Sequence, residues 1–186
     1  LLHGFYHDAG WRTCALDKCK SVNRDWGADS LTYTLYLRWR TTHDPSLVTF
    51  FEGLLSTAPQ YPPPCHGLSG LKCSWSDAPQ WDAVAALREY EVTGKNPIAL
   101  DRAAKAFDTI EDSNIYTGGA CSAIRYQQPF AYLDHLKTLE TEATAVKAAL
   151  LLYRFTAAKR YLTIAIERYA NVRRYFLDAN VPLYTV

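Results

Sequence analysis

The sequence predicts an all-α protein made of antiparallel helical hairpins, and a threefold internal repeat is the main reason. Each repeat unit has an aromatic-bearing amphipathic helix, a threonine, a short polar turn and a second apolar-periodic segment. The units include residues 35–51, 86–107 and 151–169. Their marker threonines recur at intervals of roughly 50 to 60 residues, a spacing typical of stacked repeats. Because one hairpin cannot bury both of its faces, the three must pack in series, as part of an α/α solenoid or toroid.

The first hairpin is expected from a helix over 29–40 and a second helix that opens at 44–45. Leu31, Leu35 and Trp39 recur at helical spacing in the first of these. Asp44 is a good N-cap and Pro45 a good first helical residue for the second. Residues 1–27 are expected to form the tail of a helix followed by a loop.

The second hairpin is expected from helices over 78–90 and 96–110. The first of these is apolar almost all round, which predicts burial on both sides. The second opens with Asn96–Pro97, which repeats the cap-and-proline pair of the first hairpin. Its apolar stripe consists of Leu100, Ala103, Phe107 and Ile110.

The third hairpin is expected from helices over 138–155 and 159–177, each with a continuous apolar stripe. The basic stretch 168–174 is expected on a solvated outer face. Turns inside the hairpins are short, whereas the connections 57–75 and 112–136 are long and rich in aromatics, glycine and cysteine. Long loops on one side of a helical array usually carry function, so we expect the unusual chemistry on one rim.

Composition limits the classes of function. The 186 residues carry a net charge of +1, which gives no general reason to bind nucleic acid, and no run is long enough to span a membrane. No phosphate loop, dinucleotide fingerprint or Ser-His-Asp arrangement is present, so we predict no cofactor. The chain lacks methionine. We therefore expect residues 1–186 to be a single domain that is an incomplete part of a larger protein.

Five cysteines favour an oxidising, extracellular compartment. Their loop positions predict Cys14–Cys19 and Cys65–Cys73 bridges, with Cys121 left without a partner in this chain. The competing interpretation is a metal site that combines cysteines with a histidine (His3, His7 or His66). No CxxC spacing supports that alternative, and we predict no metal site.

Two carboxylates near the first long connection could carry chemistry. Asp77 precedes the 78–90 helix and Asp82 lies within it, with Trp75 and Trp81 beside them. Paired carboxylates serve as nucleophile and general acid in sugar hydrolysis. The structural alternative for Asp77 is a capping box with Gln80, and for Asp82 an ordinary polar position.

Three stretches together resemble glycoside hydrolase family 76. They are DAPQWDAVAALREYEVTG (77–94), TGGACSAIRYQQP (117–129) and LKTLETEATAVKAALLLYRFT (136–156). The resemblance covers roughly the C-terminal two-thirds of the chain. It implies a secreted endo-α-1,6-mannanase-like protein without a cofactor, with an (α/α)6 toroid that acts on the mannan backbones of fungi or mycobacteria.

The resemblance also assigns roles to residues. An adjacent Asp-Asp pair supplies the nucleophile and the acid/base in this family; the first position corresponds to Asp77 and the second to Ala78. The family's helix after the Gly-Gly loop begins Lys-Asn, and here it reads Lys137–Thr138. Asp82, or a residue outside this chain, could supply the second carboxylate. Without one, a retaining glycosidase loses a factor of roughly 10²–10⁴ in rate.

Aromatic residues on or beside the rim loops suit a glycan, because sugar rings pack on aromatic planes. The candidates for substrate binding are Trp26, Trp75, Trp81 and Tyr126, together with the polar residues Asp29 and Lys137. The alternatives are that some of the aromatics fill space between helices and that Asp29 caps its helix.

The sequence therefore predicts a secreted module that hydrolyses or recognises a mannan-type polysaccharide or oligosaccharide. One alternative is a non-catalytic carbohydrate-binding or scaffold protein with a degenerate active site. Another is a different toroid enzyme such as a sugar epimerase, against which the small number of rim histidines argues. Half a toroid is expected to leave apolar faces of its inner helices uncovered, such as 83–87 and 146–150. We therefore expect self-association, or pairing with the rest of the parent chain.

Overall fold

The computed structural model describes residues 6–7, 10–11, 26–57, 76–111 and 137–177. Two strands, β1 (Tyr6–His7) and β2 (Gly10–Trp11), form a short antiparallel pair. The helices are α2 (Trp26–Thr42), α3 (Pro45–Thr57), α4 (Asp77–Val92), α5 (Pro97–Glu111), α6 (Leu139–Thr156) and α7 (Lys159–Asn171), and a π-helical turn, η3 (Val172–Phe176), continues α7. In the described part of the chain, no helix is both long and apolar enough to cross a membrane.

The expected hairpins are confirmed as α2–α3, α4–α5 and α6–α7. The marker threonines Thr42, Thr93 and Thr156 have the same role in all three. Each hydroxyl donates a hydrogen bond of 2.7–2.9 Å to the carbonyl oxygen four residues earlier, at the end of the first helix. The next residue has a left-handed backbone in every turn: His43, Gly94 and Ala157. At Gly94, φ is +66°, which glycine adopts without a steric cost.

Two helix starts match the expected cap-and-proline pairs. Asp44 accepts a hydrogen bond of 2.9 Å from the backbone N–H of Ser46, and Asn96 one of 3.0 Å from that of Ile98. The start of α4 differs from the expected capping box. Ser76 occupies the N-cap position without a side-chain cap bond, and Asp77 is already the first helical residue. The interpretation of Asp77 as the N-cap is therefore wrong.

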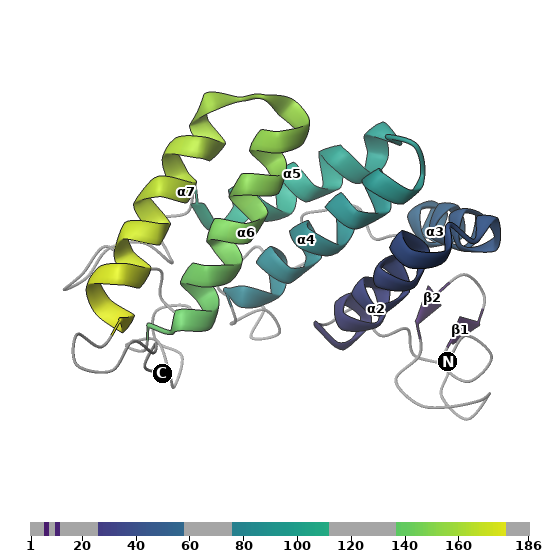
Figure 1. Ribbon diagram of the computed structural model, residues 1–186, viewed down its shortest axis with the longest axis horizontal. Coiled ribbons are helices and arrows are strands. Elements are labelled where there is room, and N and C mark those ends of the chain that lie inside the picture. The colour runs from purple at the N-terminus through teal and green to yellow at the C-terminus, as the bar shows by residue number, and fades with distance from the viewer. Residues whose placement is uncertain (1–5, 8–9, 12–25, 58–75, 112–136, 178–186) are drawn as a thin grey trace, which may run out of the picture.

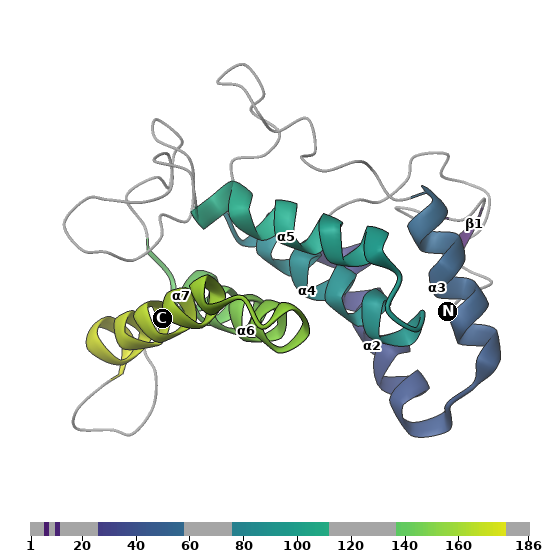
Figure 2. The same cartoon turned by 90° about the horizontal axis from the view of Figure 1, so that it is seen from above.

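The first helices of the three hairpins lie in a row, with α4 between α2 and α6 (Figure 1). The partner helix α5 packs along α4, and α7 packs along α6 (Figure 2). The row runs parallel, because residues near the C-terminal ends of α2, α4 and α6 contact one another. The N-terminal ends of α4 and α6 therefore lie at the same end of the row.

The main core fills the space between α4, α5, α6 and α7 and is rich in alanine, which lets the helices approach closely. Its wholly buried members include Ala83, Ala86, Leu87, Ala103, Ala106, Phe107, Ile110, Ala145, Ala148, Ala149 and Leu152. A second cluster joins α2 and α3 to the end of α4, through Leu35, Tyr36, Leu47, Phe51, Leu54 and Val92. The middle hairpin thus links the other two.

Three expectations need correction. The segment Ala83–Leu87 is not an uncovered face, because every one of its side chains is at most 2% exposed. Leu150, by contrast, is 46% exposed, and self-association stays a prediction. Arg168 does not belong to a solvated face: it is buried and its guanidinium lies 2.7 Å from a carboxylate oxygen of Glu111. Finally, residues 6–7 and 10–11 form strands where a helix end or loop was expected.

Candidate functional site

Asp77 lies at the mouth, our name for the shared N-terminal end of α4 and α6. Its side chain is buried, and this burial raises the pKa of its carboxyl. The negative charge of Glu140, near the start of α6, raises that pKa further, while the backbone N–H groups of Asp77 and Ala78 oppose the rise. The mouth therefore holds one carboxyl group whose pKa lies above the ordinary value of an aspartate, and a second carboxylate close enough to act on it.

The start of α6 supplies the other side of the mouth. Thr138 caps this helix: its hydroxyl accepts a hydrogen bond of 3.3 Å from the backbone N–H of Thr141 and lies 2.9 Å from the Thr141 hydroxyl. Lys137 precedes the cap and is half-buried, whereas Glu140 is exposed. Because both helices begin here, their free backbone N–H groups point toward the same region.

Gln80, one turn into α4, has an unusual environment. Its side chain is fully buried, and neither the oxygen nor the nitrogen of its amide has a hydrogen-bond partner in the described part of the protein. Buried polar groups are nearly always bonded, so this amide has a donor and an acceptor still to offer to a water or another polar group. Helical side chains lean toward the N-terminus, which directs Gln80 back over the turn that begins with Asp77.

Beyond the mouth, a lysine from α6 meets aromatic rings from both other first helices. The Lys147 ammonium nitrogen lies 4.5 Å from the ring centre of Tyr33 on α2 and 5.8 Å from that of Trp81 on α4. Burial lowers the pKa of Lys147, and the nearby charge of Arg88 lowers it further. This contact places the candidate Trp81 on the surface shared by the three first helices.

A polar network continues along the same surface. The Tyr36 hydroxyl donates a hydrogen bond of 2.9 Å to Glu91, and Arg88 lies 3.1 Å from both groups. Arg40 and Arg154 approach Glu91 from the neighbouring helices, at 4.0 Å and 3.6 Å. We call this surface the inner face; it consists of Tyr33, Tyr36, Arg40, Trp81, Arg88, Glu91, Lys147 and Arg154.

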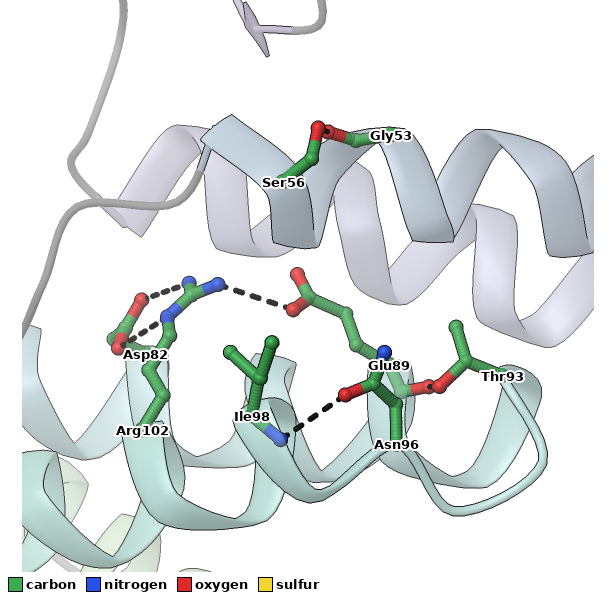
Figure 3. A network of polar contacts seen from close by, with 8 residues as sticks. All are labelled: Gly53, Ser56, Asp82, Glu89, Thr93, Asn96, Ile98 and Arg102. Carbon is green, nitrogen blue, oxygen red and sulfur yellow. Dashed lines mark hydrogen bonds and ion pairs between the residues drawn. The ribbon is translucent and has the colours of Figure 1, made fainter.

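Asp82 points to the opposite side of α4. Both of its carboxylate oxygens accept hydrogen bonds from Arg102 of α5, which also bonds Glu89 at 3.0 Å (Figure 3). Burial raises the pKa of Glu89 to about 7, although the charge of Arg102 opposes the rise. The charge of Asp29 also acts on Arg102. We call Asp82, Glu89 and Arg102 the buried acidic cluster.

The structure thus separates the sequence candidates. Asp77 lies at the mouth, Trp81 on the inner face and Lys137 just before α6. Asp82 belongs to the buried acidic cluster, and Asp29 acts on the same arginine. Trp26 is the first residue of α2, but its side chain lies outside the described residues, as do Trp75, Tyr126 and all five cysteines. Among the described side chains, no group of three or more His, Cys, Asp or Glu could hold a metal ion.

Sequence reasoning missed Glu140, Lys147 and the charged network of the inner face. The repeat carries a signal that could have found part of this network. Arg40, Glu91 and Arg154 each stand two residues before a marker threonine. Equivalent positions in parallel packed repeats lie side by side. The order arginine, glutamate, arginine at this position of the three repeats therefore predicts that Glu91 contacts both arginines.

No family model matches this sequence, and no curated protein matches it either. Solved structures do match the fold. One of them is an inactive variant of the α-1,6-mannanase GH76A of Salegentibacter sp. HEL1_6. It has alanine in place of two consecutive aspartates and is in complex with α-1,6-mannotetrose. It aligns with a TM-score of 0.71 and 17% identity, over 95% of this chain and 48% of its own. A family 76 α-mannanase of Bacteroides thetaiotaomicron aligns with a TM-score of 0.65 and 20% identity, over 86% of this chain and 46% of its own.

A third structure is an inactive variant of the same Salegentibacter enzyme, with asparagine at both positions and in complex with α-1,6-mannotriose. It covers 98% of this chain and 50% of its own, with a TM-score of 0.71 and 17% identity. The chain spans about half the length of these proteins, 46–50%. The expected fold class is confirmed: antiparallel helical hairpins that form part of an (α/α)6 toroid like that of the family 76 structures. At this level of identity the similarity establishes the fold.

Proposed function

We propose that this chain provides part of a saccharide site that recognises an α-1,6-linked mannan-type chain at the mouth. One observation carries the proposal. The solved structure that shares this fold over 95% of the chain holds α-1,6-mannotetrose although two consecutive aspartates are replaced by alanine. In that protein, a saccharide therefore binds without the two aspartates. The unpaired amide of Gln80 beside Asp77 supports a ligand at the same place.

The residues of this chain favour binding over rapid hydrolysis. The sequence resemblance aligns Asp77 with the first of the family's two aspartates and Ala78 with the second, so one carboxylate is missing. The variant with alanine at two consecutive positions is inactive, as is the variant with asparagine. We expect this chain to bind the saccharide and to hydrolyse it weakly or not at all. Trp81 and Lys137 are proposed as binding residues, with Trp26, Asp29, Trp75 and Tyr126 as further candidates.

Hydrolysis is a second candidate, which the position of Glu140 favours. A carboxyl group with a raised pKa suits a general acid, so Asp77 would donate its proton to the leaving glycosidic oxygen. Glu140, exposed on the other side of the mouth, would accept a proton from the water that attacks the anomeric carbon. Asp82 is a weaker proposal as the second carboxylate, because Arg102 binds both of its oxygens.

The test is calorimetric titration of an α-1,6-linked mannose tetrasaccharide into the wild type, Asp77→Asn and Asp77→Ala, with hydrolysis followed in parallel. We expect wild-type binding that persists in Asp77→Asn, since Asn keeps the shape and some of the hydrogen bonding. Asp101→Asn, on an exposed carboxylate of α5, is the matched control. Absence of binding in the wild type would contradict the proposal. Turnover that both Asp77→Asn and Glu140→Gln abolish would favour the second candidate.

We also propose an oxidising, extracellular location, which the five cysteines support. Peptide mapping without reduction tests the expected Cys14–Cys19 and Cys65–Cys73 bridges. Detection of a Cys73–Cys121 link would overturn this pairing scheme.

A further inference from the structure

The inner face carries an excess of positive charge. Arg40, Arg88, Lys147 and Arg154 contribute four cations, and Glu91 is the carboxylate that lies among the three arginines. Three positive charges are therefore left over on a surface that three helices share. The chain as a whole has a net charge of only +1, so this excess is local.

Of the four cations on this face, Lys147 is the one for which the described residues supply no acidic partner. In the described part of the protein its ammonium group contacts the rings of Tyr33 and Trp81 and no carboxylate. Aromatic rings attract a cation, but they do not neutralise its charge. The positive charge of Arg88 acts on Lys147 as well, and it disfavours the charged form of Lys147 rather than balancing it. The described residues therefore leave this half-buried ammonium group without a counter-ion.

Lys147 lies further along the inner face than the residues of the mouth. It lies seven residues after Glu140 on α6, a rise of about 10 Å along the helix. Trp81, which Lys147 contacts, lies one turn beyond Asp77 on α4. Aromatic rings of this kind pack against sugar rings, and Lys147 offers three N–H donors beside them. A saccharide that begins at the mouth would bring a different sugar unit to Lys147 than to Asp77.

We propose that Lys147, with Arg88 beside it, binds an anionic substituent (a phosphate, sulfate or carboxylate) on a saccharide chain that enters at the mouth. This inference rests on the proposed function and narrows its substrate class to acidic mannan-type saccharides. The Lys147 ammonium group would donate hydrogen bonds to the anion, while Tyr33 and Trp81 would pack against the sugar that carries it. Charge-assisted hydrogen bonds of this type are about twice as strong as neutral ones.

The test compares two α-1,6-linked mannose tetrasaccharides, one neutral and one with a single phosphate monoester, by calorimetry at low salt. We expect the phosphorylated form to bind about tenfold more tightly to the wild type. Lys147→Met should remove this advantage, and Lys147→Arg should keep it. Lys105→Met, on an exposed lysine of α5 that pairs with Asp101 at 2.7 Å, is the matched control and should keep it as well.

The outcomes separate this inference from the proposed function. Equal binding of both saccharides, or an advantage that survives in Lys147→Met, would overturn the anion site and leave the proposed function standing. Failure of both saccharides to bind, while inorganic phosphate alone binds in a Lys147-dependent way, would overturn the proposed function and the saccharide part of this inference. Self-association that Lys147→Met abolishes would assign the inner face to a second copy of the chain and overturn the site. Circular dichroism of Lys147→Met and Lys147→Arg checks that both are folded.

Discussion

The two polar sides of α4 differ in charge and in exposure. Toward α5, Asp82 and Glu89 share the cation Arg102, and all three side chains are at most 12% exposed. Toward α2 and α6, Glu91 meets three arginines, two of which are more than half exposed. One side is a closed cluster with excess negative charge, and the other is an open surface with excess positive charge. The comparison suggests that the first side supports the hairpin and the second is available to a ligand.

The closed side should be the more sensitive to mutation. Arg102→Met removes the only cation that contacts Asp82 and Glu89 in Figure 3, and it leaves two buried carboxylates unpaired. The expected loss in the free energy of unfolding is about 3–5 kcal/mol. Chemical denaturation measures it, and Lys105→Met on the exposed side of the same helix should change stability by less than about 0.5 kcal/mol.

A rescue variant sharpens this prediction. Combining Arg102→Met with Asp82→Asn and Glu89→Gln removes the unpaired charges, so most of the lost stability should return. If Arg102→Met alone costs less than about 1 kcal/mol, the cluster does not support the hairpin and the comparison fails.

Glu89 should make the stability of the folded protein fall as the pH rises. Its pKa rises from 4.5 to about 7 on folding, so between these values the folded state binds a proton more tightly than the unfolded chain. Its contribution to stability is therefore full below about pH 4.5 and is lost as the pH rises through 7. The loss is at most roughly 3 kcal/mol, from 1.36 kcal/mol per pKa unit. Denaturation of wild type and Glu89→Gln between pH 4.5 and 8 measures it; parallel curves for the two proteins would contradict the assignment.

The open side should respond mainly to salt. Glu91→Gln removes the carboxylate that lies among Arg40, Arg88 and Arg154, so repulsion between the cations is no longer balanced. We expect a loss of about 1–2 kcal/mol at low salt that shrinks as salt screens the charges. Glu52→Gln, on an exposed position of α3, is the control. A loss that is independent of salt would indicate that hydrogen bonding, rather than charge excess, governs the inner face.

Much of the fold could be predicted from the sequence because its signals are local. The threonine repeat and the Asp44–Pro45 and Asn96–Pro97 pairs act through bonds to residues at most four positions away, so they mark helix ends without tertiary information. The side of a helix to which a carboxylate points depends instead on its neighbours. Asp77 and Asp82 looked like a pair by spacing, yet Asp82 turns toward Arg102, twenty residues on.

The partners of Asp77 show the same limit. Glu140 is 63 residues away in the sequence and reaches the mouth because α4 and α6 are parallel neighbours. No local pattern marks such a pair. The register of the repeat predicts some contacts of this kind, such as those of Glu91 with Arg40 and Arg154.

Hydrogen exchange with and without an α-1,6-linked mannose tetrasaccharide tests most directly whether the mouth is the ligand site. The first four N–H groups of a helix lack intrahelical partners, so the first turns of α4 and α6 exchange readily unless a ligand covers them. Ligand-dependent protection of residues 77–81 and 139–143, with no change in the 93–97 turn at the far end of α4, is the result we predict. Protection confined to the far turn or to α5, or none at the mouth at saturating saccharide, would contradict it.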